Sequence, residues 1–229
     1  MLLLRELIIK MLSAGNDIVD LNLIDVNSTK DFRFYSKILC HSEQDLYITL
    51  DKKINFEQYV WLLWSIKESV YKYFKRFSPS LIFSPTKINI NQIDFPSSLT
   101  LNEIFYDEEG KSFKDKNFIK CQVKFENLIF YSISIINNSN ITTFVNTDQF
   151  FENTLWGIKR IDQINPDFQS YAVREFVLKR IKQIFPSDNY LIKKHSNGYP
   201  YLLKNDVEVN LPMSFSHHGN YISYAFEML

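Results

Sequence analysis

"SIKESVYKYFKRFSPS", residues 65–80, is a lysine-rich stretch with a counterpart later in the same chain, "AVREFVLKRIKQIFPS" at residues 172–187. The two stretches align without a gap, and their polar residues match in type. The matched pairs are Lys67 with Arg174, Glu68 with Glu175, and Lys72 with Lys179. Apolar residues recur in both stretches at the spacing of one helical face. We therefore predict two amphipathic helices, one in each half of the chain.

The sequence around each predicted helix also repeats. A short glycine-containing segment precedes each helix, and alternating sequence typical of β-strands follows it. The preceding segments are "AGNDIVDL" (14–21) and "LWGIKRI" (155–161). The following segments are "FSPTKINI" (83–90), "IKCQVKF" (119–125) and "IFYSISII" (129–136) in the first half, and "YPYLL" (199–203) and "MSFSHHGNYISYAF" (213–226) in the second. The order strand, helix, strands thus occurs twice, with a junction near 146–154.

This order predicts an α+β fold. We expect a tandem duplication of one unit, in which an antiparallel sheet packs on a long helix, with the two units related by a pseudo-two-fold axis. The first repeat would span residues 11–148 and the second, shorter repeat residues 149–229. The alternative is a chance similarity of two lysine-rich helices.

The composition is that of a globular protein without a bulk electrostatic preference. Of the 229 residues, 45% are hydrophobic and 16% aromatic, which is ample for a packed core. Because 26 basic and 26 acidic residues cancel, we do not expect a general nucleic-acid binder. Two isolated cysteines, Cys40 and Cys121, favour a reducing, cytoplasmic location over a disulfide framework.

The first residues, "MLLLRELIIKML" (1–12), form an apolar stretch that is interrupted by charge. Arg5, Glu6 and Lys10 break it, and no small-residue cleavage site follows it. We therefore expect neither a signal peptide nor a membrane span here. Met11 is an alternative start to Met1.

The first predicted helix has an unusual outer face. Glu68, Lys72 and Lys75 lie opposite its apolar stripe, which is typical of a solvated face with an i,i+4 ion pair. Trp61 and Trp64, however, share this charged face. Two indoles beside an acid indicate that the face is covered, and a carboxylate in an enclosed place needs a partner. A metal ion would serve as that partner.

Three short motifs now form a recognisable set: Gly15 to Ile18 ("GNDI"), "WSIKESVYK" (64–72) and "SFSH" (214–217). In this order and spacing they resemble the signature motifs of the 4′-phosphopantetheinyl transferase superfamily. The spacer "FRFYSKILCHSEQDL" (32–46) is similar to the pattern between the family's first two motifs. The resemblance covers about residues 15–226 and is strongest at the three motifs.

The arrangement of the motifs departs from that of the family's tandem-repeat members, which carry Ser-His in the first half and the acids in the second. Here the order is reversed, and each half has lost what the other keeps. Where the first half has Asp17, the second has Lys159; where the second half has Ser216-His217, the first has Ser134-Ile135. A two-fold pairing of the halves would leave one complete site and one dead site.

The resemblance implies a reaction: transfer of the 4′-phosphopantetheine group from coenzyme A to a serine of an acyl or peptidyl carrier protein, releasing adenosine 3′,5′-bisphosphate, in the manner of a holo-acyl-carrier-protein synthase. It implies Mg²⁺ or Mn²⁺ as cofactor. The implied metal ligands are Asp17 and Glu68, the implied catalytic residues are Glu68 as proton acceptor and Lys72 on the pyrophosphate, and the implied coenzyme A ligands are Ser216, His217, Lys72 and Arg174.

Several points stay open at this stage. Asp20 matches an acid of the family's small members but has no assigned role, and Lys179 is as consistent with a surface position as with a phosphate contact. Tyr199 replaces a lysine that larger members place before the Ser-His strand. The alternative to an enzyme is an inactive family member that binds a carrier protein or coenzyme A. We expect a monomer with no nucleic-acid or membrane partner; the sequence does not identify the carrier or its pathway.

Overall fold

The computed structural model describes residues 13–50, 53–97, 99, 107–113, 118–186, 188–196 and 198–228. The apolar stretch at residues 1–12, with both candidate start methionines, lies outside the described residues. Within them, no helix is long and apolar enough to span a membrane.

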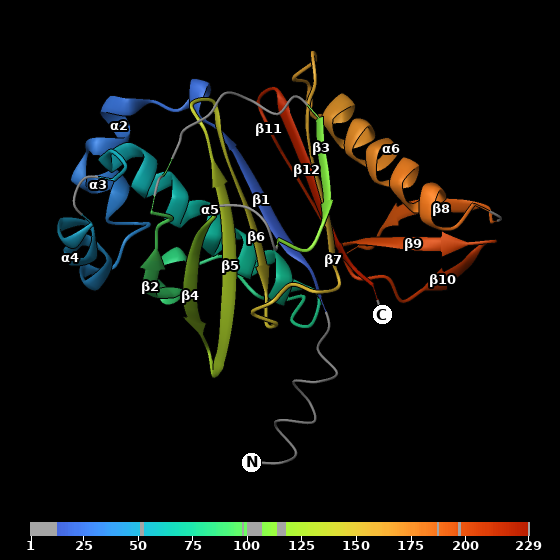
Figure 1. Cartoon of the computed structure of the whole chain (residues 1–229), viewed down its shortest axis with the longest axis horizontal. Helices are drawn as coiled ribbons and strands as arrows, with labels where there is room; N and C mark the ends of the chain where they lie inside the picture. Colours follow the sequence, from blue (N-terminus) through green and yellow to red (C-terminus); the bar gives the residue numbers. More distant parts are fainter. Residues whose placement is uncertain are drawn as a thin grey trace.

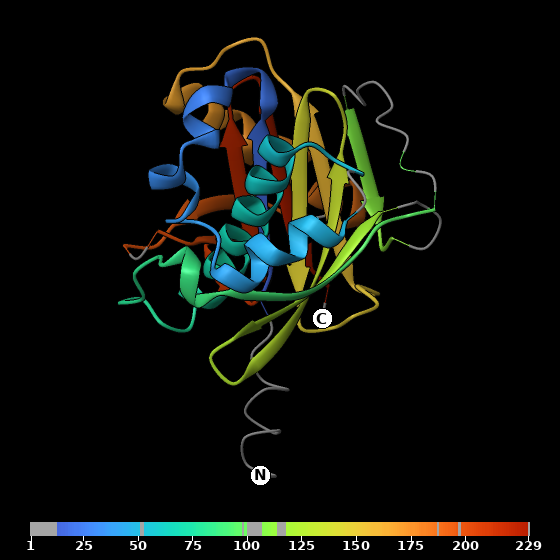
Figure 2. The same ribbon diagram turned by 90° about the vertical axis from the view of Figure 1, so that its left-hand side faces the viewer.

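The first half of the chain folds into an antiparallel sheet covered by a long helix. The sheet has the order β1-β6-β5-β4-β2. Its strands are β1 (Gly15–Asp20), β2 (Asn89–Asp94), β4 (Ile119–Phe125), β5 (Leu128–Ile136) and β6 (Asn140–Asn146). The helix α5 (Phe56–Lys75) lies across one face, as Figure 2 shows. Short helical segments connect β1 to α5: η1 (Leu21–Leu23), α2 (Val26–Lys30), α3 (Phe32–Tyr35) and α4 (His41–Thr49).

The second half of the chain again has the order strand, long helix, strands. A four-stranded antiparallel sheet has the order β11-β12-β7-β3, and a three-stranded one the order β10-β9-β8. Their strands are β3 (Asp107–Lys111), β7 (Thr154–Arg160), β8 (Tyr190–Lys194), β9 (Pro200–Lys204), β10 (Val207–Val209), β11 (Met213–His218) and β12 (Tyr221–Glu227). The long helix α6 (Pro166–Ile184) packs beside them, on the opposite side of the molecule from α5 (Figure 1).

Both predicted long helices form, and each begins before its aligned stretch and ends before that stretch does. In α5 the Asn55 side chain accepts from the Gln58 N–H in a capping box, so the helix begins at Phe56, nine residues before the aligned stretch at 65–80, and ends at Lys75. In α6 Asn165 caps the N-terminus, and Pro166 occupies the first turn. The expected strand at 83–90 is also shifted: Pro85 begins the 3₁₀ turn η2 (Pro85–Lys87), and β2 begins only at Asn89.

Three hydrophobic cores hold these layers together. One lies under α5 and one under α6. The third joins the halves, because it combines residues of β1, β5 and β6 with residues of β7 and β12. At its centre the rings of Phe113 and Trp156 stack with centroids 5.2 Å apart. The connection between β6 and β7 coincides with the predicted junction, yet β3, which precedes that junction, pairs with β7.

The halves are also joined along β1, the edge strand of the five-stranded sheet, which lies next to the four-stranded sheet (Figure 1). On one side β1 pairs with β6. On the other side, alternate backbone N–H groups of β1 donate to side chains of β11 instead of to its backbone. The three bonds run from Asn16 N to Ser214 Oγ (3.1 Å), from Ile18 N to Ser216 Oγ (3.0 Å) and from Asp20 N to His218 Nδ1 (2.8 Å). This joint sets β1 and β11 side by side in the same direction.

Candidate active site

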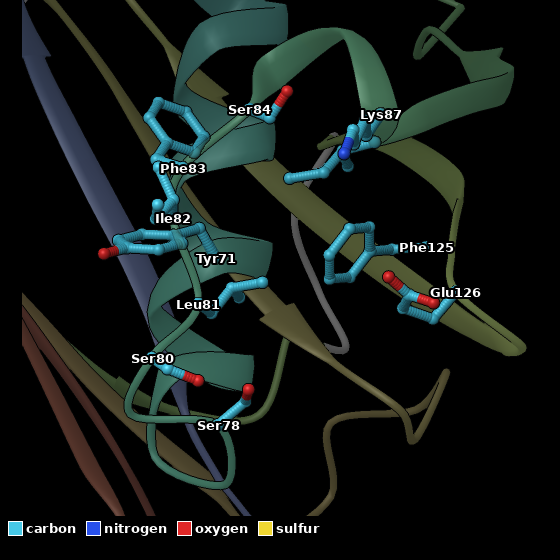
Figure 3. A pocket seen from close by; sticks show the side chains of 11 residues that line it. Tyr71, Ser78, Ser80, Leu81, Ile82, Phe83, Ser84, Lys87, Phe125 and Glu126 are labelled. Atoms are coloured by element: carbon cyan, nitrogen blue, oxygen red, sulfur yellow. The ribbon is translucent and has the colours of Figure 1, made fainter.

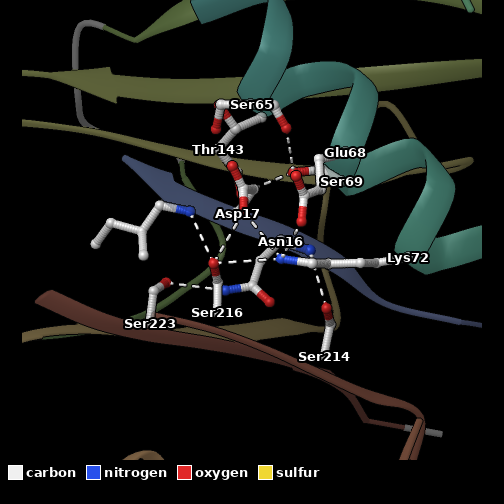
Figure 4. A network of polar contacts seen from close by, with 11 residues as sticks. Asn16, Asp17, Ser65, Glu68, Ser69, Lys72, Thr143, Ser214, Ser216 and Ser223 are labelled. Atoms are coloured by element: carbon white, nitrogen blue, oxygen red, sulfur yellow. Dashed lines mark hydrogen bonds and ion pairs between the residues drawn. The ribbon is translucent and has the colours of Figure 1, made fainter. Parts of the chain in front are cut away.

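The joint between β1 and β11 brings an acid, a lysine and a serine together beneath α5. Lys72 Nζ lies 2.9 Å from Asp17 Oδ1 and 3.4 Å from Glu68 Oε1. Ser216 donates its hydroxyl to the same Asp17 oxygen at 2.9 Å. Figure 4 shows these side chains converging from three elements, with Asp17 on β1, Glu68 and Lys72 on α5, and Ser216 on β11. The structure thus assembles four of the predicted site residues from both halves of the chain.

The close approach of β1 to α5 depends on Gly15. A Cβ at this position would overlap the backbone carbonyl oxygen of Ser69 in α5. Glycine therefore allows the strand to lie directly against the helix. Asp17, two residues along the strand, points to the same side as Gly15 and so faces Glu68 and Lys72. The "GND" motif thus supplies both the contact and the acid.

Burial gives the charged groups of this cluster unusual proton affinities. Burial raises the pKa of Glu68, and the charge of Asp17 raises it further, while Lys72 and a hydrogen bond with Trp64 act in the opposite direction. For Lys72, burial alone would lower the pKa, but Asp17 and Glu68 outweigh it and the pKa is raised. The cluster therefore holds a protonated lysine between two acids, one of which has an increased affinity for protons.

The two tryptophans predicted to be covered are indeed packed against other elements. Trp61 donates its indole N–H to Thr29 Oγ1 of α2 at 3.0 Å. Trp64 makes an edge contact with the ring of Phe83, with centroids 5.2 Å apart. The outer face of α5 is consequently enclosed by α2 and by the segment before β2, and Glu68 is only partly exposed.

His217 lies beside Ser216 in the sequence but on the other face of β11. There it lines a cavity of about 100 Å³ that also contains Arg174 of α6 and Lys193 and Lys194 of β8. Burial lowers the pKa of His217, and the charges of Lys72 and Lys194 lower it further. This basic pocket and the acid cluster are therefore neighbours within electrostatic reach, separated by β11.

Residues 13–122 match the family model of the 4′-phosphopantetheinyl transferase superfamily. The chain carries a 4′-phosphopantetheinyl transferase superfamily domain. Searches among curated proteins and among solved structures found no match to the chain. The matched region contains Asp17, Glu68 and Lys72, whereas Ser216 and His217 lie beyond it. The fold class is consistent with this superfamily, as mixed helices and antiparallel sheets were expected.

The other residues that the sequence analysis singled out fall in different places. Arg174 lines the pocket of His217, but Lys179 is exposed and lines a separate hollow between α6 and the strands β3 and β7. Ser134 is buried, with its hydroxyl bonded to that of Thr143 at 2.9 Å. The centroid of the Tyr199 ring lies 4.4 Å from that of the His195 ring. The neighbouring Gly198 lines the basic pocket, and Tyr199 brings no positive charge to it.

Asp20 has a structural explanation. Its Oδ1 accepts from the Asn22 backbone N–H and its Oδ2 from the Asn220 backbone N–H, both at 3.0 Å. It therefore caps η1 and ties the end of β1 to the β11–β12 turn. Gly219 in that turn has φ +54°, and a Cβ there would overlap Asp20 Oδ2. Asp20 and the turn are thus fitted to one another.

Ser216 has less freedom than its predicted role requires. Its hydroxyl accepts from the Ile18 N–H and from Lys72 Nζ (3.3 Å) and donates to Asp17. A hydroxyl has one proton, so donation to Asp17 competes with the predicted donation to a coenzyme A phosphate. In this geometry Ser216 orients Asp17.

The donor set fits a divalent cation. Mg²⁺ is commonly held by one or two carboxylates, with water and substrate phosphates completing its octahedron. Asp17 and Glu68 both reach one cationic group, the Lys72 ammonium, so their oxygens converge on a single point. The described residues contain no cluster of three or more Asp, Glu, His or Cys side chains that could hold a metal alone. A bound ion would therefore need water or substrate oxygens.

Sequence reasoning missed a second ion pair on α5. Lys67, which precedes Glu68, points into the core and meets Glu43 of α4 at 2.6 Å. Helical spacing does not predict a partner for Lys67, because Glu43 is distant in the sequence.

A further cavity, of about 350 Å³, opens beside Tyr71, Leu81 and Phe83 (Figure 3) and contains none of the predicted site residues.

Proposed function

We propose that this protein transfers the 4′-phosphopantetheine group of coenzyme A to a serine of an apo acyl or peptidyl carrier protein, as a holo-acyl-carrier-protein synthase-type enzyme. The observation that carries the proposal is the Lys72 ammonium held between Asp17 and Glu68 at the joint of the two halves. Membership of the superfamily supports a transferase, coenzyme A and carrier partners, and a divalent metal.

The reaction needs a proton acceptor and a way to offset charge. The carrier serine oxygen attacks the phosphorus nearer the pantetheine, its proton leaves, and the phosphorus–oxygen bond to adenosine 3′,5′-bisphosphate breaks. Most catalysis of phosphoryl transfer comes from positioning and electrostatic stabilisation. Mg²⁺, or Mn²⁺ in its place, held by Asp17 and Glu68, would offset negative charge on the pyrophosphate oxygens.

The chain's own residues divide the remaining work. Glu68 is the proposed proton acceptor, because its carboxylate stands beside Lys72 in the acid cluster where the pyrophosphate would bind. Lys72 supplies a positive point charge to the pyrophosphate. Ser216 holds Asp17 in place through its hydrogen bond.

The basic pocket on the far face of β11 is the proposed site for the nucleotide phosphates of coenzyme A. His217 and Arg174 line it, and Lys193 and Lys194 add positive charge. These side chains come from β11, α6 and β8, so the second half would bind the nucleotide while the first half carries the chemistry. We further propose that the halves arose by tandem duplication and that the enzyme acts in the cytoplasm as a monomer.

An intact-mass assay tests this proposal. The protein is incubated with coenzyme A, Mg²⁺ and a panel of apo acyl and peptidyl carriers, and each carrier is weighed afterwards. The expected result is a phosphopantetheine adduct on at least one carrier that disappears when its serine is changed to alanine. Binding of coenzyme A without any adduct would overturn the enzymatic proposal in favour of a coenzyme A-binding subunit.

A further inference from the structure

The ion pair between Glu43 of α4 and Lys67 of α5 is completely enclosed. Both side chains are 0% exposed, and Lys67 Nζ lies 2.6 Å from Glu43 Oε2. Lys67 also donates to the Ile38 carbonyl oxygen at 2.7 Å. A charge pair removed from water in this way is weak evidence for a gain in stability, since well-packed apolar residues often do as well. Its presence on the helix that carries Glu68 and Lys72 therefore needs another explanation.

Glu43 connects α5 to two other parts of the first half, the start of α4 and the strand β2. Its Oε2 accepts from the Cys40 N–H at 2.9 Å, at the start of α4. Its Oε1 accepts from the Ile90 N–H at 3.0 Å, on the edge strand β2. A second bond to α5 comes from Tyr59, which donates its hydroxyl to the Glu43 backbone carbonyl at 2.6 Å. Glu43 thus ties α5 to elements that do not touch Asp17.

The position of Lys67 on α5 makes it sensitive to rotation of the helix. Successive residues are about 100° apart, so Glu68 lies a quarter turn from Lys67, and Lys72 lies about 40° beyond Glu68. On another side Ser69 packs against Gly15. A rotation of about 10° would move an atom about 6 Å from the helix axis by about 1 Å. Such a shift is enough to open the contact between Lys72 and Asp17.

We propose that Glu43 and Lys67 are positioning residues: their buried ion pair fixes the rotation of α5 and so holds Glu68 and Lys72 against Asp17. This inference rests on the proposed function for its kinetic consequence, but not for its structural one. If the ion pair only stabilised the fold, the transfer activity of each variant would follow its stability. If the ion pair positions α5, transfer activity should stay low in a variant whose stability has been restored.

The experiment removes both charges at once. Lys67→Met alone strands the Glu43 carboxylate and should unfold at a lower urea concentration than the parent. The double variant Lys67→Met/Glu43→Gln leaves no buried charge, and the glutamine amide oxygen keeps one of the two N–H bonds that the Glu43 carboxylate accepts. Its unfolding midpoint should therefore return part of the way toward the parent's. We expect its kcat for transfer to stay about 10- to 100-fold below the parent's, with a nearly unchanged KM for coenzyme A.

Two further measurements keep the result decisive. Lys75→Met, on the same helix but bonded to the Leu81 carbonyl outside the site, is the matched control and should leave kcat within about twofold. Glu43→Asp keeps the charge and shortens the side chain, so it serves if the double variant does not fold, and it should also lower kcat with little change in KM. A parent-like kcat in whichever of these two variants folds would overturn the proposal.

A crystal structure of the folded variant separates this proposal from the proposed function. We expect α5 to be rotated and the contact of 2.9 Å between Lys72 and Asp17 to be lost. An unrotated α5 with that contact intact would overturn the positioning role, whether or not the parent modifies a carrier. Failure of the parent to modify any carrier, together with a rotated α5, would overturn only the proposed function.

Discussion

The two long helices carry a glutamate and a lysine at the same i,i+4 spacing in very different surroundings. On α5, Glu68 and Lys72 are partly enclosed and meet Asp17 from β1. On α6, Glu175 and Lys179 are exposed and line an open hollow of about 960 Å³ on the outside of the molecule. The strand beside that hollow presents Lys159, which the sequence comparison aligns with Asp17 and which stands over the Phe176 ring.

This difference shows that the helix motif alone does not make a site. The Glu68–Lys72 pair on α5 lies beside an acid of β1 and a hydroxyl of β11, and α2 packs over the same face of the helix. The pair on α6 faces a lysine instead of an acid. Burial and an opposite charge on the adjoining strand therefore distinguish the candidate active site from its counterpart, and each can be altered separately.

Among the strand positions, the largest effect is expected at Asp17. Asp17→Asn should lower the transfer rate about a thousandfold, because an amide offers Lys72 and a cation no negative charge. The matched change in the second half, Lys159→Gln, should leave the rate within about twofold. Rates of carrier modification under single-turnover conditions measure both. An Asp17→Asn variant that keeps more than about a tenth of the parent rate would contradict the assignment.

Glu227 in the second half is a buried acid with neutral partners, which contrasts with Asp17 and its lysine. Asn146 Nδ2 and Thr154 Oγ1 donate to its Oε1. Burial raises its pKa from 4.5 to about 7. The folded state then binds more protons than the unfolded state between these values, so this acid's contribution to stability is lost as the pH rises through that window.

Glu227→Gln should remove the pH dependence of stability that comes from this acid. The amide oxygen accepts the same two bonds, so the variant should match the parent near pH 4.5 and exceed its free energy of unfolding by roughly 2–3 kcal/mol at pH 8. Urea unfolding at intervals between these pH values measures the difference. An identical pH dependence in parent and variant would show that Glu227 ionises normally.

A smaller effect is expected on coenzyme A binding from α6. Arg174→Ala should raise the KM for coenzyme A about tenfold, because it removes a charge-assisted contact from the pocket of His217. Lys179→Ala, on the same helix but in the outer hollow, should leave the KM unchanged. Equal increases in the two variants would indicate a diffuse charge effect instead of a pocket.

The smallest kinetic effect is expected at Asp20. Asp20→Asn keeps only one of the two acceptor oxygens that cap η1 and the β11–β12 turn, and should cost about 1 kcal/mol of stability. Its transfer rate should stay within about twofold of the parent, since both oxygens already accept backbone N–H groups. Thermal unfolding and the transfer assay together test this, and a large loss of rate at unchanged stability would give Asp20 a direct role.

Much of the acid cluster could be predicted because its residues lie in short motifs whose spacing reports their geometry. Glu68 and Lys72 are one helical turn apart, and the indoles of Trp61 and Trp64 indicated that their face is covered. The helix starts were also readable, since Asn55 with Gln58 and Asn165 with Pro166 are ordinary capping signals. The aligned stretches at 65–80 and 172–187 begin inside these helices, because the repeat and not the caps defined them.

The remaining features depend on contacts between segments that are distant in the sequence. The burial of Lys67 requires Glu43, and no local pattern connects them. The pairing of β3 with β7 places a strand of the first half in the sheet of the second. The donation of β1 amides to Ser214, Ser216 and His218 likewise depends on how the two halves meet. The periodicity of a sequence shows which face of a helix or strand is buried, but it does not show which distant segment packs against that face.

The most direct test of the central claim compares the two helices in one assay. Single-turnover transfer of phosphopantetheine to a carrier is followed by intact mass for the parent, Glu68→Gln and Glu175→Gln. We predict that Glu68→Gln lowers the rate about 10²- to 10⁴-fold, as expected for loss of a general base, and that Glu175→Gln stays within about twofold. Folded variants with equal rates would contradict the assignment of the active site to β1, α5 and β11.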